Sequence, residues 1–283
     1  MFTAPQSDVC KNVGLFGRIQ DADWRIGVSG DGHASARLSW INAGKIDARV
    51  DLIGDHRTFG AGALEMRIDP QGERDAFRRA VVSDGIRPLA EQIVGGDYSA
   101  LAQRLPKDRE RLPTIVLNPS QDFLVEPRHR SLLSYWRANS TPDAPMRRSA
   151  LDPIALRDVM GYLLLLHADE TGLDFEFRVY GTEIAQIAGR DWTGWTVGAM
   201  SLKTRSQLGD FYRAVYVACA LSRQPIFTEH DSPPWLSAKS WRRLIVPLID
   251  DAGAPSWFLV ANQPYEIRPL GNEAHALRER ILG

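Results

Sequence analysis

Cysteine is scarce in this chain of 283 residues, which contains only Cys10 and Cys219. A disulfide framework needs an even set of cysteines at short spacings, and a structural zinc site needs clustered cysteine and histidine ligands. Neither pattern is present, since the two cysteines lie far apart and neither belongs to a CxxC pair. We therefore expect two ordinary thiols, with Cys219 a small core residue, and no metal site.

Long apolar runs are also missing. The densest run, from Tyr162 to Leu166, is far shorter than the roughly 20 residues that a membrane-spanning helix needs. The first ten residues, MFTAPQSDVC, lack the basic start and the apolar stretch of a signal peptide. We therefore expect a cytoplasmic protein that does not act at a membrane.

The chain has no excess of charge of either sign. Its 34 Lys and Arg residues balance 35 Asp and Glu residues, which gives a formal net charge of -1. This balance offers no general attraction to nucleic acid, so no nucleic-acid partner is expected. A local basic bias between residues 104 and 148 is interpreted as a solvated surface, with a phosphate site as the less favoured reading. Its most basic members are Arg128, Arg130, Arg147 and Arg148.

Sequence motifs of catalysis are absent. There is no GxSxG, no HExxH and no cysteine and histidine pair close together in sequence. The pair Gly44-Lys45 lacks both the earlier glycine and the following Ser or Thr of a phosphate-binding loop. Asp250 and Asp251 fit a hairpin turn better than an acid and base pair. The chain is therefore predicted to be no enzyme, and no catalytic residue is assigned.

What the chain does have is enough apolar sequence, 44% of its residues, for a sizeable core and two domains. Apolar and polar residues alternate over 24–28, 36–40, 46–52 and 64–68, which predicts antiparallel strands, the second and third joined as a hairpin across residues 42–45. Helical spacing follows from about Glu73, and again at 89–94 and 99–105. We predict a small α+β domain over residues 1–105 and a proline-rich linker over 106–127.

In the second half, the stretch from Phe175 to Gly194 predicts a strand, a sharp turn at Gly181 and a short helix. Thr182 is the expected N-cap of that helix. Further elements follow from the same rules: a buried strand at 162–167, helices at 132–136, 204–221 and 272–282, and strands at 226–229, 241–249 and 257–262, the last two joined by a turn at 250–253.

Short motifs in this half occur in a characteristic order. They are Leu133-xx-Trp136, Pro145-xx-Arg148, Leu151-Asp152-Pro153, the run from Phe177 to Ile184, the run from Gly189 to Gly194, and the run from Leu244 to Leu248. Together they closely resemble the bacterial PAS_5 family of PAS-fold proteins over roughly residues 130–262. The resemblance implies an α+β domain with a five-stranded antiparallel sheet, helices on one face, and a small cavity between the long helix and the sheet.

We set the limits of this PAS-like domain at residues 128–267 and those of a C-terminal helix at 268–283; residues 1–105 resemble no family. The resemblance also implies a function, because members of the fold sense a small molecule, light or redox state, or mediate protein association. A flavin photosensor of this fold needs a cysteine where this chain has Gly189-Arg190-Asp191-Trp192. Haem-binding members often take a histidine from the long helix, and 204–221 contains none. No cofactor is therefore predicted, and His167 and His230 are expected to be surface or capping residues.

The remaining prediction is an apolar cavity for a small organic ligand. Its candidate lining residues are Phe177, Arg178, Val179, Ile184, Ile187, Phe211, Val215, Val246, Leu248, Phe258 and Val260. For the apolar members, plain core packing is the favoured alternative. The resemblance puts an arginine at Arg178, for which an ion pair is favoured over ligand recognition. Four tryptophans form either an aromatic wall or packing between helices and sheet: Trp192, Trp195, Trp241 and Trp257.

We therefore predict a signalling or regulatory protein whose PAS-like domain binds a small organic molecule or a protein partner. The helix around Trp136 and the helix at 272–282 are the expected contacts for a homodimer or a signalling partner. Two alternatives remain. One is a structural interaction module with a filled core and no ligand, and the other is a nucleotide or phosphate-binding regulator that uses the arginines at the domain junction.

Overall fold

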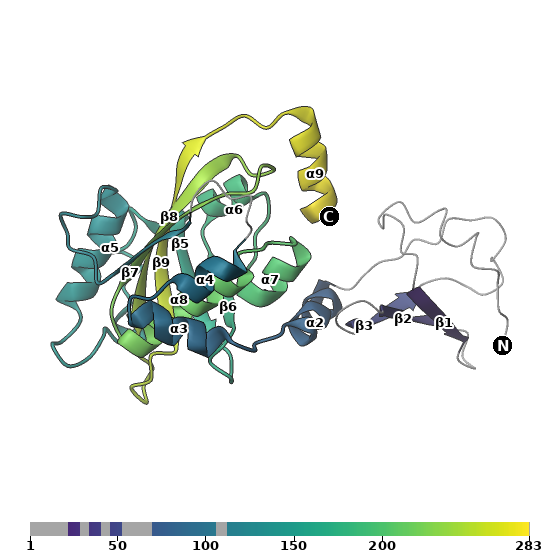
Figure 1. The fold of residues 1–283 in the computed structure, drawn as a ribbon, viewed down its shortest axis with the longest axis horizontal. Coiled ribbons are helices and arrows are strands. Elements are labelled where there is room, and N and C mark those ends of the chain that lie inside the picture. Colours follow the sequence, from purple (N-terminus) through teal and green to yellow (C-terminus); the bar gives the residue numbers. More distant parts are fainter. Residues whose placement is uncertain (1–21, 29–33, 41–45, 53–69, 106–111, 283) are drawn as a thin grey trace. The chain divides into compact units, whose positions relative to one another are not determined.

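The computed structural model describes residues 22–28, 34–40, 46–52, 70–105 and 112–282 (Figure 1). The chain divides into two compact units, Met1–Val81 and Val82–Gly283. The predicted limit of the first domain at residue 105 does not coincide with this division. The reason is helix α3 (Ile86–Val94), which packs against α8 (Gly209–Ser222) of the second unit and buries Ile86, Leu89, Ala90 and Ile93.

The first unit contains an antiparallel sheet in the order β1 (Ala22–Val28), β2 (Ala34–Trp40) and β3 (Ile46–Leu52). Leu38 pairs with Ala48 and Trp40 with Ile46, so the pairing predicted for the hairpin is confirmed. Helix α2 (Pro70–Ala80) follows. The strand predicted at 64–68 and the turn at 42–45 lie outside the described residues.

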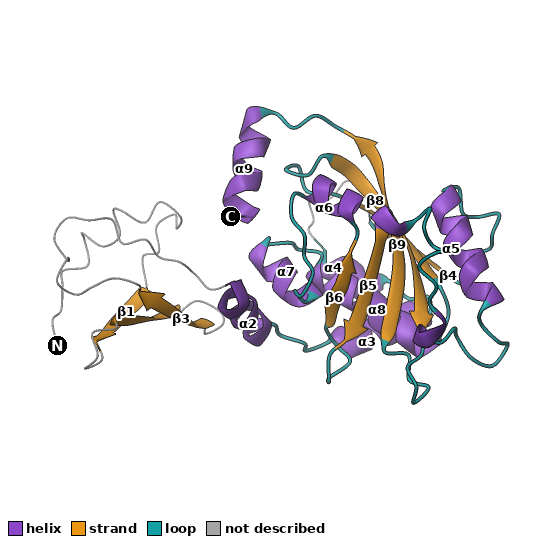
Figure 2. Cartoon of the chain, turned by 180° about the vertical axis from the view of Figure 1, so that it is seen from behind, coloured by secondary structure: helices purple, strands orange, loops and turns teal. Residues whose placement is uncertain are grey.

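The second unit is built on a six-stranded antiparallel sheet in the order β4-β7-β8-β9-β5-β6 (Figure 2). Its strands are β4 (Thr114–Leu117), β5 (Leu163–Ala168), β6 (Phe175–Tyr180), β7 (Ile226–Asp231), β8 (Ala238–Leu248) and β9 (Trp257–Ile267). The α+β class and the antiparallel sheet are confirmed, but five strands were predicted. The sixth is β4, an edge strand inside the segment predicted as a linker, and it is only four residues long between Pro113 and Pro119.

The remaining helices of this unit are α4 (Ser99–Arg104), α5 (Pro127–Ala138), α6 (Thr182–Ala188), α7 (Val197–Lys203) and α9 (Asn272–Leu282). The long helix α8 begins at Gly209, five positions later than predicted. Arg205 has a left-handed backbone, φ 52°, which ends the helical path between α7 and α8. The predicted cap is also wrong, because Gly181 is the N-cap of α6 and no side chain caps it.

Helices cover both faces of the sheet, whereas one covered face was predicted. On β8, Leu244, Val246 and Leu248 join a hydrophobic cluster with Trp136 of α5. The alternating residues Trp241 and Arg243 point to the other face, the face of α8, because successive side chains of a strand point to opposite sides. The run from Leu244 to Leu248 is apolar without interruption for this reason, since both of its faces are buried.

The chain passes very close to itself at Gly181, between β6 and α6. A Cβ added there would overlap the carbonyl oxygen of Gly161 and would lie 2.9 Å from the carbonyl oxygen of Leu163. Both are backbone atoms, so neither can move aside without shifting its strand or turn. This position therefore requires glycine for its lack of a side chain.

We expect Gly181→Ala to lower the free energy of unfolding by about 1–3 kcal/mol, the usual cost of forcing an extra methyl group into a packed site. Urea denaturation measures the change. Gly271→Ala is the matched control, because no atom lies within 4 Å of a Cβ built at Gly271. Its effect should stay within about 0.5 kcal/mol. Equal losses in the two variants would contradict the steric explanation.

Candidate functional site

A cavity of about 100 Å³ lies between helices α6, α7 and α8 and the sheet face that they cover. For comparison, a cavity of about 150 Å³ in another protein admits benzene. Many of the residues that line it are aromatic, among them Tyr180, Trp192, Tyr212, Tyr216, Trp235 and Trp241. Its polar groups include Arg243, His230 and Asn262. A site of this kind can hold a small organic molecule and orient it.

Arg243 is the centre of a row of polar side chains across three strands. It lies opposite Thr228 on β7 and opposite Asn262 on β9, and all three are buried. Its Nε donates a hydrogen bond to Thr228 Oγ1 at 3.2 Å, and its guanidinium carbon is 4.7 Å from the ring centre of Tyr212. The Nη2 atom of Arg243 and the Oδ1 atom of Asn262 have no hydrogen-bond partner. The sheet pairing therefore holds a cation and an amide side by side at the cavity wall.

Tyr212 and His230 form the second polar feature of the wall, with Tyr212 Oη and His230 Nε2 3.0 Å apart. Helix α8 presents Tyr212 and Tyr216 one turn apart, on the same face. His230 is only 3% exposed, so the expectation of a surface or capping histidine is wrong. Packing of α8 against β7 buries it, and a residue's place at a strand end cannot reveal such packing.

The phenols of Tyr180 and Tyr216, near Arg243, remain neutral at neutral pH. Burial raises the pKa of Tyr180 above its usual value, and the neighbouring Arg243 charge only partly opposes this. Burial likewise raises the pKa of Tyr216, again against the influence of Arg243. The cavity thus combines hydroxyl groups that keep their protons with one permanent cation.

Of the predicted lining residues, Phe177 does line the cavity. Arg178 is exposed on β6, where its Nη1 lies 2.9 Å from Glu176 Oε1, and Val179 is 41% exposed. Val246 and Leu248 belong to the cluster with α5 on the opposite sheet face. The others lie in the surrounding core, fully buried at Ile184, Phe211, Val215, Phe258 and Val260 and half-buried at Ile187.

The four tryptophans do not form one wall. Trp192 and Trp241 line the cavity, and Trp195 packs edge-on against Trp192 with their ring centres 5.2 Å apart. Trp257 lies elsewhere, 4.2 Å from the ring of His167. Sequence reasoning missed Arg243, Tyr180, Tyr216 and Asn262 as cavity residues. The available signal was the alternation of Trp241 and Arg243 just before an apolar run.

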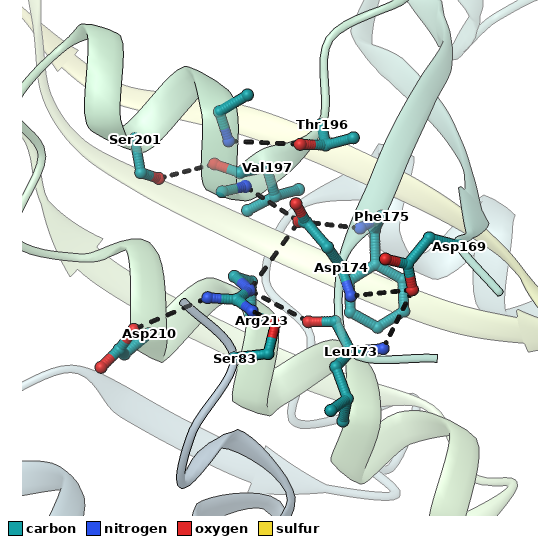
Figure 3. A network of polar contacts seen from close by, with 12 residues as sticks. Ser83, Asp169, Leu173, Asp174, Phe175, Thr196, Val197, Ser201, Asp210 and Arg213 are labelled. Atoms are coloured by element: carbon teal, nitrogen blue, oxygen red, sulfur yellow. Dashed lines mark hydrogen bonds and ion pairs between the residues drawn. The ribbon is translucent and has the colours of Figure 1, made fainter. Parts of the chain in front are cut away.

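A buried polar network lies close to the cavity (Figure 3). Asp174, just before β6, accepts hydrogen bonds from the backbone N–H groups of Phe175 and Gly198 through Oδ1, each at 2.9 Å. The Nε of Arg213 lies 3.8 Å from the same oxygen and donates to the Leu173 carbonyl at 3.0 Å. Burial is the main cause that raises the pKa of Asp174, while its hydrogen bonds and Arg213 oppose that rise.

Arg213 also fastens α8 to the segment that leads into α3. Its Nη1 donates to the Val82 carbonyl at 2.8 Å and its Nη2 to Ser83 Oγ at 2.6 Å. Through Arg213, helix α8, which carries Tyr212 and Tyr216, therefore contacts the start of β6 and the first residues of the second unit, and it reaches α7 through Asp174.

Three of the four arginines predicted for a phosphate site have separate partners. Arg128 stacks on the ring of Tyr162 at 3.9 Å, and Arg148 on that of Trp257 at 4.2 Å. Arg130 donates to the Leu124 carbonyl. Across the described parts of the chain, no group of three or more His, Cys, Asp or Glu residues could hold a metal ion. Nor does any helix in those parts have the length and apolar character to span a bilayer.

Residues 125–261 match the model of the PAS_5 family, which describes a PAS domain. This match confirms the family resemblance that the motifs predicted for residues 130–262. Among solved structures, the chain is similar to an RNA-binding light-oxygen-voltage receptor, with 14% identity and a TM-score of 0.29 over 88% of this chain and 78% of that chain. That TM-score is too low to support an inference. No curated protein matches the chain.

Proposed function

Since residues 125–261 carry the PAS domain of the PAS_5 family, we propose that this chain is a non-catalytic sensor whose cavity binds a small organic molecule. A sensor or regulatory role is what a PAS domain supports by itself. Ligand binding is the further step, and one observation supports it: the cavity of about 100 Å³ has the buried polar groups of Arg243 and Asn262 in its wall. An interaction module with a filled core would have neither the space nor a use for these groups.

Binding would act by favouring one arrangement of the cavity wall over another. The wall combines α8 with the segment from α6 to α7, and a ligand that fits one packing better shifts the equilibrium by its difference in affinity. A tenfold preference corresponds to about 1.4 kcal/mol. Because this shift is small, we expect the signal to leave through a part of the chain that contacts the cavity wall directly.

Helix α9 is attached in this way. Arg190 lies between the cavity residues Ala188 and Trp192, and its Nη1 donates to the Leu282 carbonyl at 2.7 Å. Arg278 of α9 donates to the Gln186 carbonyl at 3.1 Å. We therefore assign to α9 the contact with a signalling partner or a second copy of the chain. The predicted contact through Trp136 loses support, because that side chain is buried and donates to the Pro247 carbonyl at 2.7 Å.

Native mass spectrometry beside denaturing mass spectrometry, with an absorbance spectrum, tests ligand binding. We expect the freshly purified protein to carry extra mass without visible colour. Ala188→Leu should abolish the extra mass, because Ala188 lines the cavity and a leucine would fill it. Ala138→Leu, at an exposed position of α5, is the matched control and should keep the mass.

Two outcomes would contradict the proposal. A wild-type protein without bound mass, together with an Ala188→Leu variant of higher stability, would favour the interaction module, since filling an unused cavity stabilises a fold. An absorbance band of flavin or haem would show that the bound molecule is a chromophore, which contradicts the proposed colourless ligand.

A further inference from the structure

We propose that the cavity selects a small carboxylate and that Arg243 binds the negative charge of this ligand. The inference rests on the proposed function, namely that the cavity holds an organic ligand, and it adds the chemical class of that ligand. Three observations carry it: the missing counter-charge of Arg243, the place of this residue in the cavity wall, and the size of the cavity.

The guanidinium of Arg243 is buried without a carboxylate partner. The side chain is 6% exposed, and none of the ion pairs among the described residues includes it. The neighbouring Arg242 differs, since it pairs with Glu126 at 2.9 Å and with Glu229 at 3.0 Å. Arg213, which is also deeply buried, lies 3.8 Å from Asp174. Because an unpaired buried charge is costly, its retention at Arg243 indicates a counter-charge that arrives from outside.

Arg243 lines the cavity and has unused hydrogen-bonding capacity. Its Nε donates a hydrogen bond to Thr228 Oγ1 at 3.2 Å, whereas its Nη2 has no hydrogen-bond partner. Aromatic rings hold the guanidinium plane in place, with the ring centre of Tyr212 at 4.7 Å and that of Tyr216 at 5.8 Å. A planar guanidinium fixed in this way suits a planar carboxylate, to which it can donate two parallel hydrogen bonds.

The size of the cavity limits the ligand to a few heavy atoms. Its volume of about 100 Å³ is smaller than the roughly 150 Å³ that admits benzene. Acetate, propionate and pyruvate are of this size, whereas a nucleotide or a haem is far too large. The neutral phenols of Tyr180 and Tyr216 add no negative charge that would repel an anion. The aromatic wall suits the short carbon chain of such an acid.

Isothermal titration calorimetry on the full chain tests the inference, with acetate, propionate and pyruvate as probes at constant ionic strength. Propionamide is the matched neutral probe, since it has nearly the shape of propionate without its charge. We expect at least one carboxylate to bind at micromolar or lower concentration, tight enough to stay bound during purification, and propionamide to bind at least tenfold more weakly than propionate. Nitrate, a planar inorganic anion, should bind at least tenfold more weakly than the best carboxylate.

Arg243→Met should weaken binding of the carboxylate at least tenfold and leave the weak binding of propionamide unchanged. Arg242→Met is the control on the same strand, because Arg242 is absent from the cavity wall and its partners are Glu126 and Glu229. It should bind the carboxylate as the wild type does. If Arg243→Met fails to fold, the comparison of propionate with propionamide on the wild type still decides the question.

Equal affinities for propionate and propionamide would overturn the inference, as would equal affinities for nitrate and the best carboxylate, or no binding of any of the three acids. The proposed sensor function would survive any of these results, provided that the wild type carries a bound mass and the Ala188→Leu variant does not. If the wild type carries no bound mass, the proposed function itself is contradicted.

Discussion

Replacing Arg213 by methionine is expected to lower the free energy of unfolding by about 3–5 kcal/mol, the usual cost of removing one partner of a buried ion pair. Arg213 is 3% exposed. Its loss would leave the Asp174 carboxylate buried without its cation, and the carbonyls of Leu173 and Val82 without the donors they now have. The cavity helix α8 would also lose its tie to the segment before α3.

Chemical denaturation measures this loss, and two comparisons identify its cause. Arg157→Met removes an exposed pair with Asp158, 3.5 Å long, and should cost no more than about 1 kcal/mol. Adding Asp174→Asn to Arg213→Met should restore part of the lost stability, because asparagine keeps an oxygen acceptor but carries no charge. If the single and double variants are equally unstable, the buried charge is not the cause of the loss.

Acidification from pH 6.5 to pH 4 is expected to cost the fold about 3 kcal/mol through His129 alone. Burial is the main cause that lowers the pKa of His129 from 6.5 to about 4, while the nearby Glu126 opposes this and the Arg242 charge adds to it. In this pH range His129 becomes protonated in the unfolded chain, whereas it stays largely neutral in the folded protein. The stability contributed by neutral His129 is therefore fully present above pH 6.5 and is lost as the pH falls toward 4.

The measurement is the difference in unfolding free energy between pH 6.5 and pH 4 in each variant, so that other acid-sensitive groups cancel. His129→Gln should reduce this difference by about 3 kcal/mol, because glutamine does not titrate. His275→Gln, at an exposed position of α9, should leave it unchanged. An unchanged difference in His129→Gln would show that another group causes the acid sensitivity.

Elements set by local patterns were predictable from the sequence. The hairpin of β8 and β9 is an example: Leu248 pairs with Trp257, and Asp250 closes the turn by accepting from the Ala254 N–H at 2.9 Å. Strand β6 and helix α6 followed from alternation and helical spacing in the same way. The family motifs also reside in short segments, so they could be recognised before the fold was known.

Tertiary structure decided which strand lies at the edge of the sheet and which helix covers each face of a strand. Strand β4 exists because Ile115 and its neighbours pair with β7, more than a hundred residues later. The sequence could not say which face of β8 meets which helix, because Leu244 to Leu248 are buried on both sides. Val246 and Leu248 were assigned to the cavity for that reason, although they pack against α5.

The sequence by itself thus determined a PAS-type α+β domain, through motifs and periodicities that need only neighbouring residues. It could not determine the cavity, because that site is made by residues distant in sequence. The pairing of β7, β8 and β9 brings Thr228, Arg243 and Asn262 into one row, and α8 then closes over them. A single arginine in a strand says nothing about its counter-charge; only the folded chain reveals that Arg243 is buried without one.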